Sequence, residues 1–142
     1  MAKTFKTGDL LPAITKQITQ ERIAGWAELS GDFNRLHVDP AYARETRFGG
    51  TIAHGPMSLA FLNELMMSCF GLLWAKGGRL QDVRFLAPIR PGDLIVIGGK
   101  VEQVQEAGNR NTLHCRLEIS KDGGETTAVS GLGVIPLNEA KK

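Results

Sequence analysis

The sequence predicts an α+β domain in which an antiparallel sheet of about five strands wraps around one long helix. Two observations predict this fold class. Residues 56–75 are apolar on nearly every face of a helix, and such a helix is buried all round. Residues 80–136 read as strand-like segments separated by tight turns, a pattern typical of an antiparallel meander. A long buried helix beside such a meander implies a sheet that curls around it.

The chain opens with a short strand within residues 4–19. Ile14, Lys16 and Ile18 alternate loosely between apolar and polar, which is the period of a half-buried strand.

Two short helices follow and form an insert at about residues 20–45. Thr19 is suited to cap the first helix, and Gly31 is suited to end it. Asp39 and Pro40 have the types preferred at the N-cap and first position of a second helix, which runs to about Glu45. A glycine-rich loop at 48–55 then leads to the long helix.

The long helix ends at Gly77-Gly78, and the meander begins there. Its expected strands occupy residues 80–89, 94–105, 112–120 and 126–136. Pro91-Gly92-Asp93 and Asp122-Gly123-Gly124 supply the turns.

Length and charge narrow the class of protein. The chain has 142 residues, and we expect residues 1–142 to form a single domain with a sizeable core. The net charge of +2 is small, and Lys and Arg are spread along the chain rather than clustered. This distribution argues against a nucleic-acid partner.

No targeting or membrane segment is expected. The N-terminus lacks the apolar run of a signal peptide, and residues 57–75 are interrupted by Ser58, Asn63, Glu64 and Ser68. That stretch falls short of the ~20 apolar residues that a membrane span needs. We therefore expect a cytoplasmic protein without membrane contact.

The two cysteines, Cys69 and Cys115, lie far apart in apolar patterns. Their separation matches no metal-ligand spacing, and buried free thiols in a reducing compartment are the expected state.

The run SGDFNRLHVDPAYA, residues 30–43, carries the candidate chemistry. Asp32 and His37 are five residues apart, with Asn34 between them, in an expected non-helical link between two short helices. Taken singly, Asp32 and Asn34 are ordinary turn residues, and His37 is an ordinary core histidine. Taken together, a carboxylate and an imidazole that face one cavity orient one water molecule from two sides.

A second candidate feature is the start of the long helix. Gly55 places an unhindered N–H at the helix N-terminus, and Pro56 fits the first turn because it needs no hydrogen-bond acceptor. The helix dipole favours a developing negative charge on oxygen at that point. The simpler interpretation, that Gly55-Pro56 merely starts a helix, stays open. For His54 we expect only a hydrogen bond that fixes the loop, and for His114 a structural or solvent-facing place.

These motifs resemble the hydratase motif of the MaoC-like (R)-specific enoyl-CoA hydratases, which have the hot-dog fold. The family pattern places Asp, Asn and His at the spacing of Asp32, Asn34 and His37, with a small residue at the position of Ala43. Arg35 stands where the family usually has proline. The segments AHGPMSLAFL and VRFLAPIRPGDLI also resemble the family, so the likeness covers about residues 10–136.

The resemblance implies roles for individual residues. It implies that Asp32 and His37 form a catalytic dyad. It also implies that the Gly55 N–H polarises the thioester oxygen and that Asn34 supports the active-site loop. Some relatives carry a serine that bonds the aspartate. Asn63 stands at that position here, with Ser58 earlier on the helix.

The expected activity is the reversible syn addition of water to a trans-2-enoyl-CoA, giving (3R)-3-hydroxyacyl-CoA. The substrate is an acyl thioester of coenzyme A or of acyl-carrier protein, and no metal or redox cofactor is implied. Candidate residues for the wall of the acyl pocket are Met57, Phe61 and Trp74. The resemblance also implies a homodimer or a larger homo-oligomer, because pairing would cover an exposed edge strand.

Two other functions fit the same fold. A hot-dog acyl-CoA thioesterase would hydrolyse related substrates, but such relatives lack the linked Asp, Asn and His. A noncatalytic partner subunit of a heteromeric dehydratase would complete a substrate groove, and such subunits typically lack one or both dyad residues, whereas this chain keeps Asp32 and His37.

Overall fold

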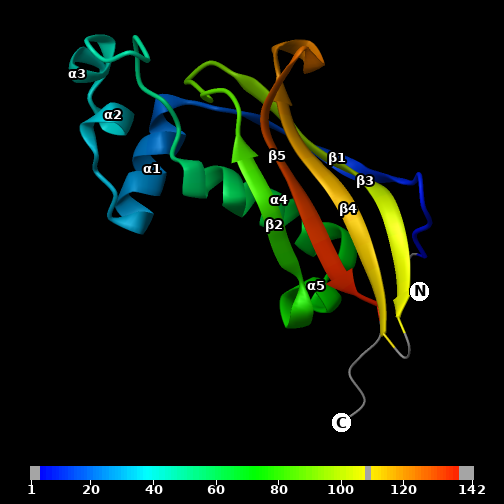
Figure 1. Ribbon diagram of the computed structural model, residues 1–142. Helices are drawn as coiled ribbons and strands as arrows, with labels where there is room; N and C mark the ends of the chain where they lie inside the picture. Colours follow the sequence, from blue (N-terminus) through cyan, green and yellow to red (C-terminus); the bar gives the residue numbers. More distant parts are fainter. Residues whose placement is uncertain (1–3, 108–109, 138–142) are drawn as a thin grey trace.

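A curved antiparallel sheet of five strands wraps around a central helix, which confirms the α+β class expected from the sequence (Figure 1). The structure is a computed structural model that describes residues 4–107 and 110–137. Along the chain the elements are β1 (Leu10–Gln17), α1 (Gln20–Ser30), α2 (Arg35–Val38), α3 (Pro40–Arg44), α4 (Gly55–Phe70), α5 (Leu72–Gly77), β2 (Arg79–Phe85), β3 (Leu94–Ala107), β4 (Arg110–Lys121), the 3₁₀ turn η1 (Asp122–Gly124) and β5 (Thr126–Pro136).

The strands lie in the order β1-β3-β4-β5-β2, and each pair is antiparallel. The long strands β3, β4 and β5 form the centre, as the meander predicts. β1 and β2 are the two edges. On β2 the register shifts between Gln81 and Arg84, and Asp82 within this bulge has a φ of 51°. The sheet thus leaves an irregular edge at β2.

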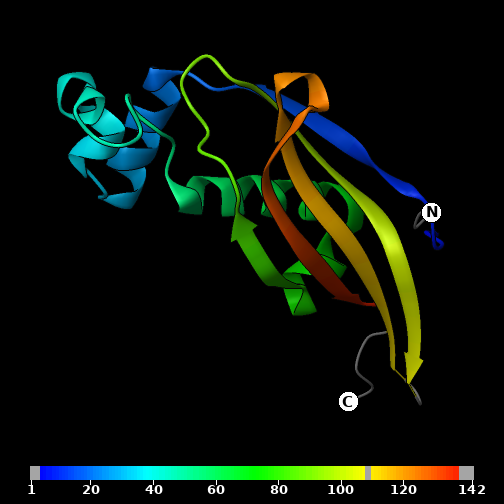
Figure 2. The same cartoon turned by 45° about the horizontal axis from the view of Figure 1, so that its top comes forward.

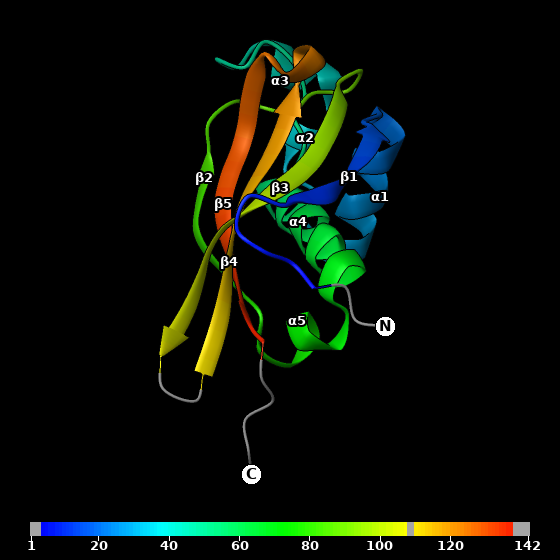
Figure 3. The same ribbon diagram turned by 90° about the vertical axis from the view of Figure 1, so that its right-hand side faces the viewer.

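Helix α4 lies against the inner face of the sheet (Figures 2 and 3). Leu62, Leu65 and Met66 are fully buried there. The sheet contributes buried side chains from its central strands to the same cluster, among them Ile97, Val101, Leu117, Ile119, Val129 and Ile135. Burial of each such side chain stabilises the fold by about 1.5–3 kcal/mol.

The long helix is broken, contrary to the single helix expected over 56–75. It ends at Phe70, and Gly71 has a φ of 54°, a conformation that side-chain-bearing residues rarely adopt. The Gly71 N–H still bonds the Met67 carbonyl at 2.8 Å, which closes the last turn. α5 then begins at Leu72 in a new direction and ends at Gly77. The expected stop at Gly77-Gly78 is confirmed.

The expectation that this helix is buried all round is wrong. Asn63, Glu64 and Met67 are exposed, because the sheet covers only one side of α4. Within the described residues, no helix combines the length and the apolar character needed to cross a membrane.

The insert at 20–45 is present, with one helix more than expected. Thr19 caps α1 by accepting the Arg22 N–H at 3.1 Å, and Gly31 ends the helix, both as predicted. Asp39 caps α3. The link between them was expected to be non-helical, but it contains α2. Asn34 supplies the cap that this extra turn needs.

Candidate active site

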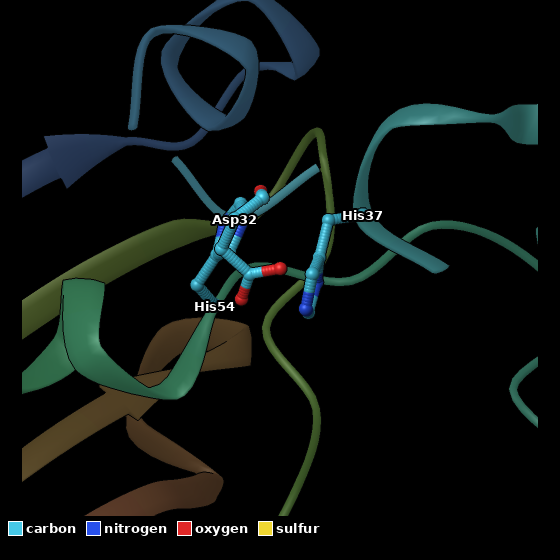
Figure 4. A group of neighbouring side chains, drawn as sticks. All are labelled: Asp32, His37 and His54. Atoms are coloured by element: carbon cyan, nitrogen blue, oxygen red, sulfur yellow. The ribbon is translucent and has the colours of Figure 1, made fainter. Parts of the chain in front are cut away.

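Asp32, His37 and His54 come together at one end of α4 (Figure 4). One nitrogen from each histidine and a carboxylate oxygen of Asp32 all lie within 4.8 Å of one another. Asp32 follows α1, His37 belongs to α2, and His54 directly precedes α4. Sequence reasoning placed Asp32 and His37 in one site, and it left His54 out.

Asp32 is held by the turn that ends α1. Gly31 adopts a left-handed conformation with φ 78°, which turns the chain away from the helix axis. The Asp32 N–H then donates to Ser30 Oγ at 3.2 Å, and Asp32 Oδ1 accepts the Asn34 N–H at 3.1 Å. The residue is exposed, so its carboxylate is accessible from solvent.

His37 is fixed by a backbone carbonyl. Its Nδ1 lies 2.8 Å from the carbonyl oxygen of Ile52. A carbonyl only accepts hydrogen bonds, so Nδ1 carries the hydrogen, and in the neutral ring Nε2 presents a lone pair. Asn34 caps the same helix, because its Oδ1 accepts the Leu36 N–H at 3.0 Å. The structure therefore places Asn34 between the two members of the expected dyad.

His54 makes the loop-fixing hydrogen bond expected of it, from Nε2 to the Asp32 carbonyl oxygen at 3.0 Å. Its ring also stacks on His37, with centroids 3.9 Å apart and planes 26° apart. The side chain is 1% exposed, and among the described residues its Nδ1 has no hydrogen-bond partner. Its place directly before Gly55 was the signal in the sequence that it belongs to the same site.

The group suits proton transfer better than metal binding. Imidazole lone pairs lie in the ring plane, and two stacked rings direct theirs along nearly parallel planes rather than toward one ion. His37 Nδ1 and His54 Nε2 are bonded to carbonyl oxygens, so His37 Nε2 is the ring nitrogen left beside the Asp32 carboxylate. A lone pair on His37 beside a carboxylate is the arrangement that takes a proton from a bound molecule.

The N-terminus of α4 lies beside this group. Gly55 is the first residue of the helix, and the N-cap residue His54 makes no capping hydrogen bond with its side chain. The first N–H groups of a helix lack acceptors within it, so this end of α4 is suited to an oxygen that gains negative charge. A Cβ built on Gly55 would lie 3.3 Å from the ring of Phe85, on the edge strand β2.

The segment before α4 is tied to the sheet. The Ala53 N–H donates to the Ile89 carbonyl at 2.7 Å. The loop that carries Ile89 is anchored in turn by Lys121, whose Nζ lies 2.8 Å from the Pro88 oxygen and 3.1 Å from Asp93 Oδ2. Both charged side chains are largely buried, at 11% and 18% exposed. An ion pair at the end of β4 thus helps to fix the position of His54 and Gly55.

The other expected site residues are spread along the helices. Met57, Ser58 and Phe61 are buried in the first half of α4. Asn63 lies about 12 Å farther along the helix axis than Gly55, at 1.5 Å per residue. Its Oδ1 accepts the Trp74 Nε1–H at 2.9 Å. The structure therefore places Asn63 away from the helix end that Asp32 approaches. Trp74 lies beside Asn63 because the break at Gly71 folds α5 back onto α4.

Arg35, which stands where the family usually has proline, bonds within the insert. Its guanidinium forms an ion pair with Asp39 at 3.0 Å and lies over the Tyr42 ring at 4.3 Å. The Tyr42 N–H, together with the Arg35 hydrogen bond, lowers the pKa of Asp39 below its ordinary value. The departure from the motif leaves Asp32 and His37 together.

Comparisons with known proteins show similarity in sequence and in fold. A family model described as a MaoC-like domain matches residues 6–122. The chain is 32% identical over 126 residues to the (R)-specific enoyl-CoA hydratase of Aeromonas caviae, covering 87% of this chain and 90% of that one. The solved structure of the (R)-hydratase from A. caviae involved in PHA biosynthesis superposes with a TM-score of 0.79, at 29% identity, over 96% of this chain and all of that one.

A mycobacterial relative matches over a shorter stretch. The chain is 39% identical over 95 residues to the 3-hydroxyacyl-thioester dehydratase Z of Mycobacterium tuberculosis strain H37Rv. The alignment covers 65% of this chain and 63% of the relative, less than two thirds of its length.

The capping role of Asn34 is testable apart from catalysis. Replacing Asn34 with Ala leaves the Leu36 N–H without its acceptor, and we expect the free energy of unfolding to fall by about 1 kcal/mol. Denaturant unfolding measures this change. Asn34→Asp keeps an acceptor at the cap and is the matched control. Equal stability of Asn34→Ala and the natural protein would contradict the role.

Proposed function

Since this chain belongs to the MaoC-like domain family, we propose that it is an enoyl-thioester hydratase that adds water to a trans-2-enoyl-CoA and gives (3R)-3-hydroxyacyl-CoA. The same site would run the reverse dehydration. The observation that carries the proposal is the convergence of Asp32 and His37 beside the uncapped N-terminus of α4.

The names of the two relatives support this reaction class. One is named a hydratase of enoyl-CoA and the other a dehydratase of 3-hydroxyacyl thioesters. These are the two directions of one reaction. The stereochemistry and the thioester carrier, coenzyme A or acyl-carrier protein, are proposed for this chain from the same likeness.

In the proposed mechanism Asp32 and His37 hold one water molecule. The Asp32 carboxylate and the lone pair on His37 Nε2 accept its two hydrogens, because His37 Nδ1 is occupied by Ile52. As the water oxygen bonds to C3, Asp32, assisted by His37, takes its proton. The C2–C3 double-bond electrons move toward the thioester carbonyl. Asp32 and His37 then return a proton to C2.

Gly55 has the complementary role. The negative charge that develops on the thioester oxygen would be stabilised by the Gly55 N–H and by the dipole of α4. No step of this scheme needs a metal or a redox group. Met57 and Phe61, on the first half of α4, remain candidates for the wall of the acyl pocket. Trp74 would take part only at the far end of a long acyl chain.

Purified protein mixed with crotonyl-CoA tests the proposal. Loss of the enoyl-thioester absorbance without release of free CoA is the expected result. Release of free CoA would indicate a thioesterase instead. Inertness that is relieved by a second, different chain would indicate a partner subunit.

Asp32→Asn and His37→Ala should each lower kcat by about 10²–10⁴-fold, the contribution of a general acid–base group. Because both residues act on one water, the double variant should be little slower than the slower single variant. Circular dichroism checks that each variant is folded. Near-normal turnover of Asp32→Asn would refute the assignment.

Gly55→Val should lower kcat/KM strongly while Asp32 and His37 stay in place. A branched side chain would keep the thioester oxygen from the N–H, and loss of one such donor costs roughly 3–4 kcal/mol in other enzymes. Asn63→Ala, whose contact is with Trp74, is the control and should cost much less. Full activity of a folded Gly55→Val would mean that the thioester is polarised elsewhere.

We also propose that the chain forms a homodimer through the β2 edge. Phe85, on β2, and Leu86, which follows it, are 56% and 57% exposed, and the edge strand has unpaired backbone groups. Sedimentation equilibrium should give twice the chain mass at micromolar concentration. A monomer under these conditions would overturn this proposal.

A further inference from the structure

Gln20 links three segments that meet at the candidate site. It is the first residue of α1, so its side chain projects from the start of the helix. Its Nε2 donates to the His37 carbonyl oxygen at 2.8 Å, and its Oε1 accepts the Thr51 hydroxyl at 2.6 Å. One amide thus holds α2 and the segment before α4 at the same time.

These bonds close a ring around His37. The His37 side chain donates to Ile52, the residue after Thr51, and Thr51 returns through Gln20 to the His37 carbonyl. His37 is therefore held at its ring by Ile52 and at its backbone by Gln20, which is itself bonded to Thr51. Thr51 is 7% exposed, which shields its hydroxyl bond from competing water.

The link matters because α2 is too short to fix His37 alone. A helix of four residues has almost no internal hydrogen bonds, and its last carbonyls lack partners within it. Gln20 satisfies one of those carbonyls. An amide is also the group that combines the required donor and acceptor, whereas a carboxylate has no hydrogen to donate.

We propose that Gln20 is a positioning residue, which fixes the orientation of His37 by bridging its carbonyl to Thr51. The inference rests on the proposed function, in which His37 Nε2 faces the reacting water. Without the bridge, α2 and the 51–53 segment would still be joined by the His37–Ile52 bond and by the Ile52 N–H, which lies 3.4 Å from the Leu36 carbonyl oxygen. The His37 backbone would then be held less firmly, and Nε2 would lose part of its alignment. Misplacement of a reacting group lowers turnover more than it weakens binding.

The first experiment compares Gln20→Ala with Gln17→Ala. Gln17 is a matched control because its amide also donates to backbone carbonyls, those of Gly92 and Asp93, and makes no contact with His37. We expect Gln20→Ala to lower kcat about tenfold with KM changed less than twofold. Gln17→Ala should keep the kcat of the natural protein. An equal loss in both variants would show general loosening and overturn the proposal.

Substitutions at both ends of the bridge separate its two bonds. Gln20→Glu keeps an acceptor for Thr51 but cannot donate to His37, so it should resemble Gln20→Ala. Thr51→Val removes the hydroxyl and should lower kcat, whereas Thr51→Ser restores it and should rescue turnover. Gln20→Ala combined with Thr51→Val should be no worse than Gln20→Ala alone. Additive losses would argue against a single bridge.

Nitrogen-15 NMR of the His37 ring supplies a readout that does not need catalysis. The natural protein should show one tautomer with hydrogen on Nδ1, and Gln20→Ala should show a mixture. If the natural protein fails to hydrate crotonyl-CoA but the tautomer still depends on Gln20, the proposed function is wrong and the positioning role stands. An active natural protein with unchanged kcat and unchanged tautomer in Gln20→Ala would overturn the positioning role.

Discussion

Helix α4 packs into the curve of the sheet through side chains that are fully buried, among them Leu62, Leu65 and Met66. Because a packed helix cannot slide or rotate without opening cavities, this contact fixes where its N-terminus points. The insert between β1 and α4 then places its polar residues Asp32 and His37 at that end of the helix. The position of Gly55 is therefore set by the hydrophobic core, and the polar group assembles around it.

Backbone carbonyls orient the two histidine rings of the site. Ile52 fixes the ring of His37, and Asp32 fixes the ring of His54 through its own carbonyl. Each bond joins segments that are distant in sequence, so the loop before α4 and the insert hold each other in place. The Lys121–Asp93 pair extends this bracing to the sheet, through Ile89 and Ala53.

Local features of this protein could be predicted from the sequence, and contacts between segments could not. The caps at Thr19 and Asp39 and the stop at Gly31 follow from side chains that bond their own neighbours. The break at Gly71 was missed because the apolar pattern continues through it. The pairing of Asn63 with Trp74 depends on that break, which redirects α5. His54 was left out because its contacts with Asp32 and His37 are tertiary, although its place directly before Gly55 was a signal that it lies at the same helix end.

The hydrogen atoms of the two stacked imidazoles have a chemical consequence. Each ring commits one N–H to a backbone carbonyl, so that hydrogen is not available to a molecule beside the Asp32 carboxylate. The charge of a molecule that enters the site then matters. In the proposed reaction, the Asp32 carboxylate would accept a hydrogen from a bound water molecule and would repel the like charge of a free carboxylate placed beside it. Under the proposed function, the thioester link would thus remove the charge of the acyl group's own carboxylate as well as activate the group for addition.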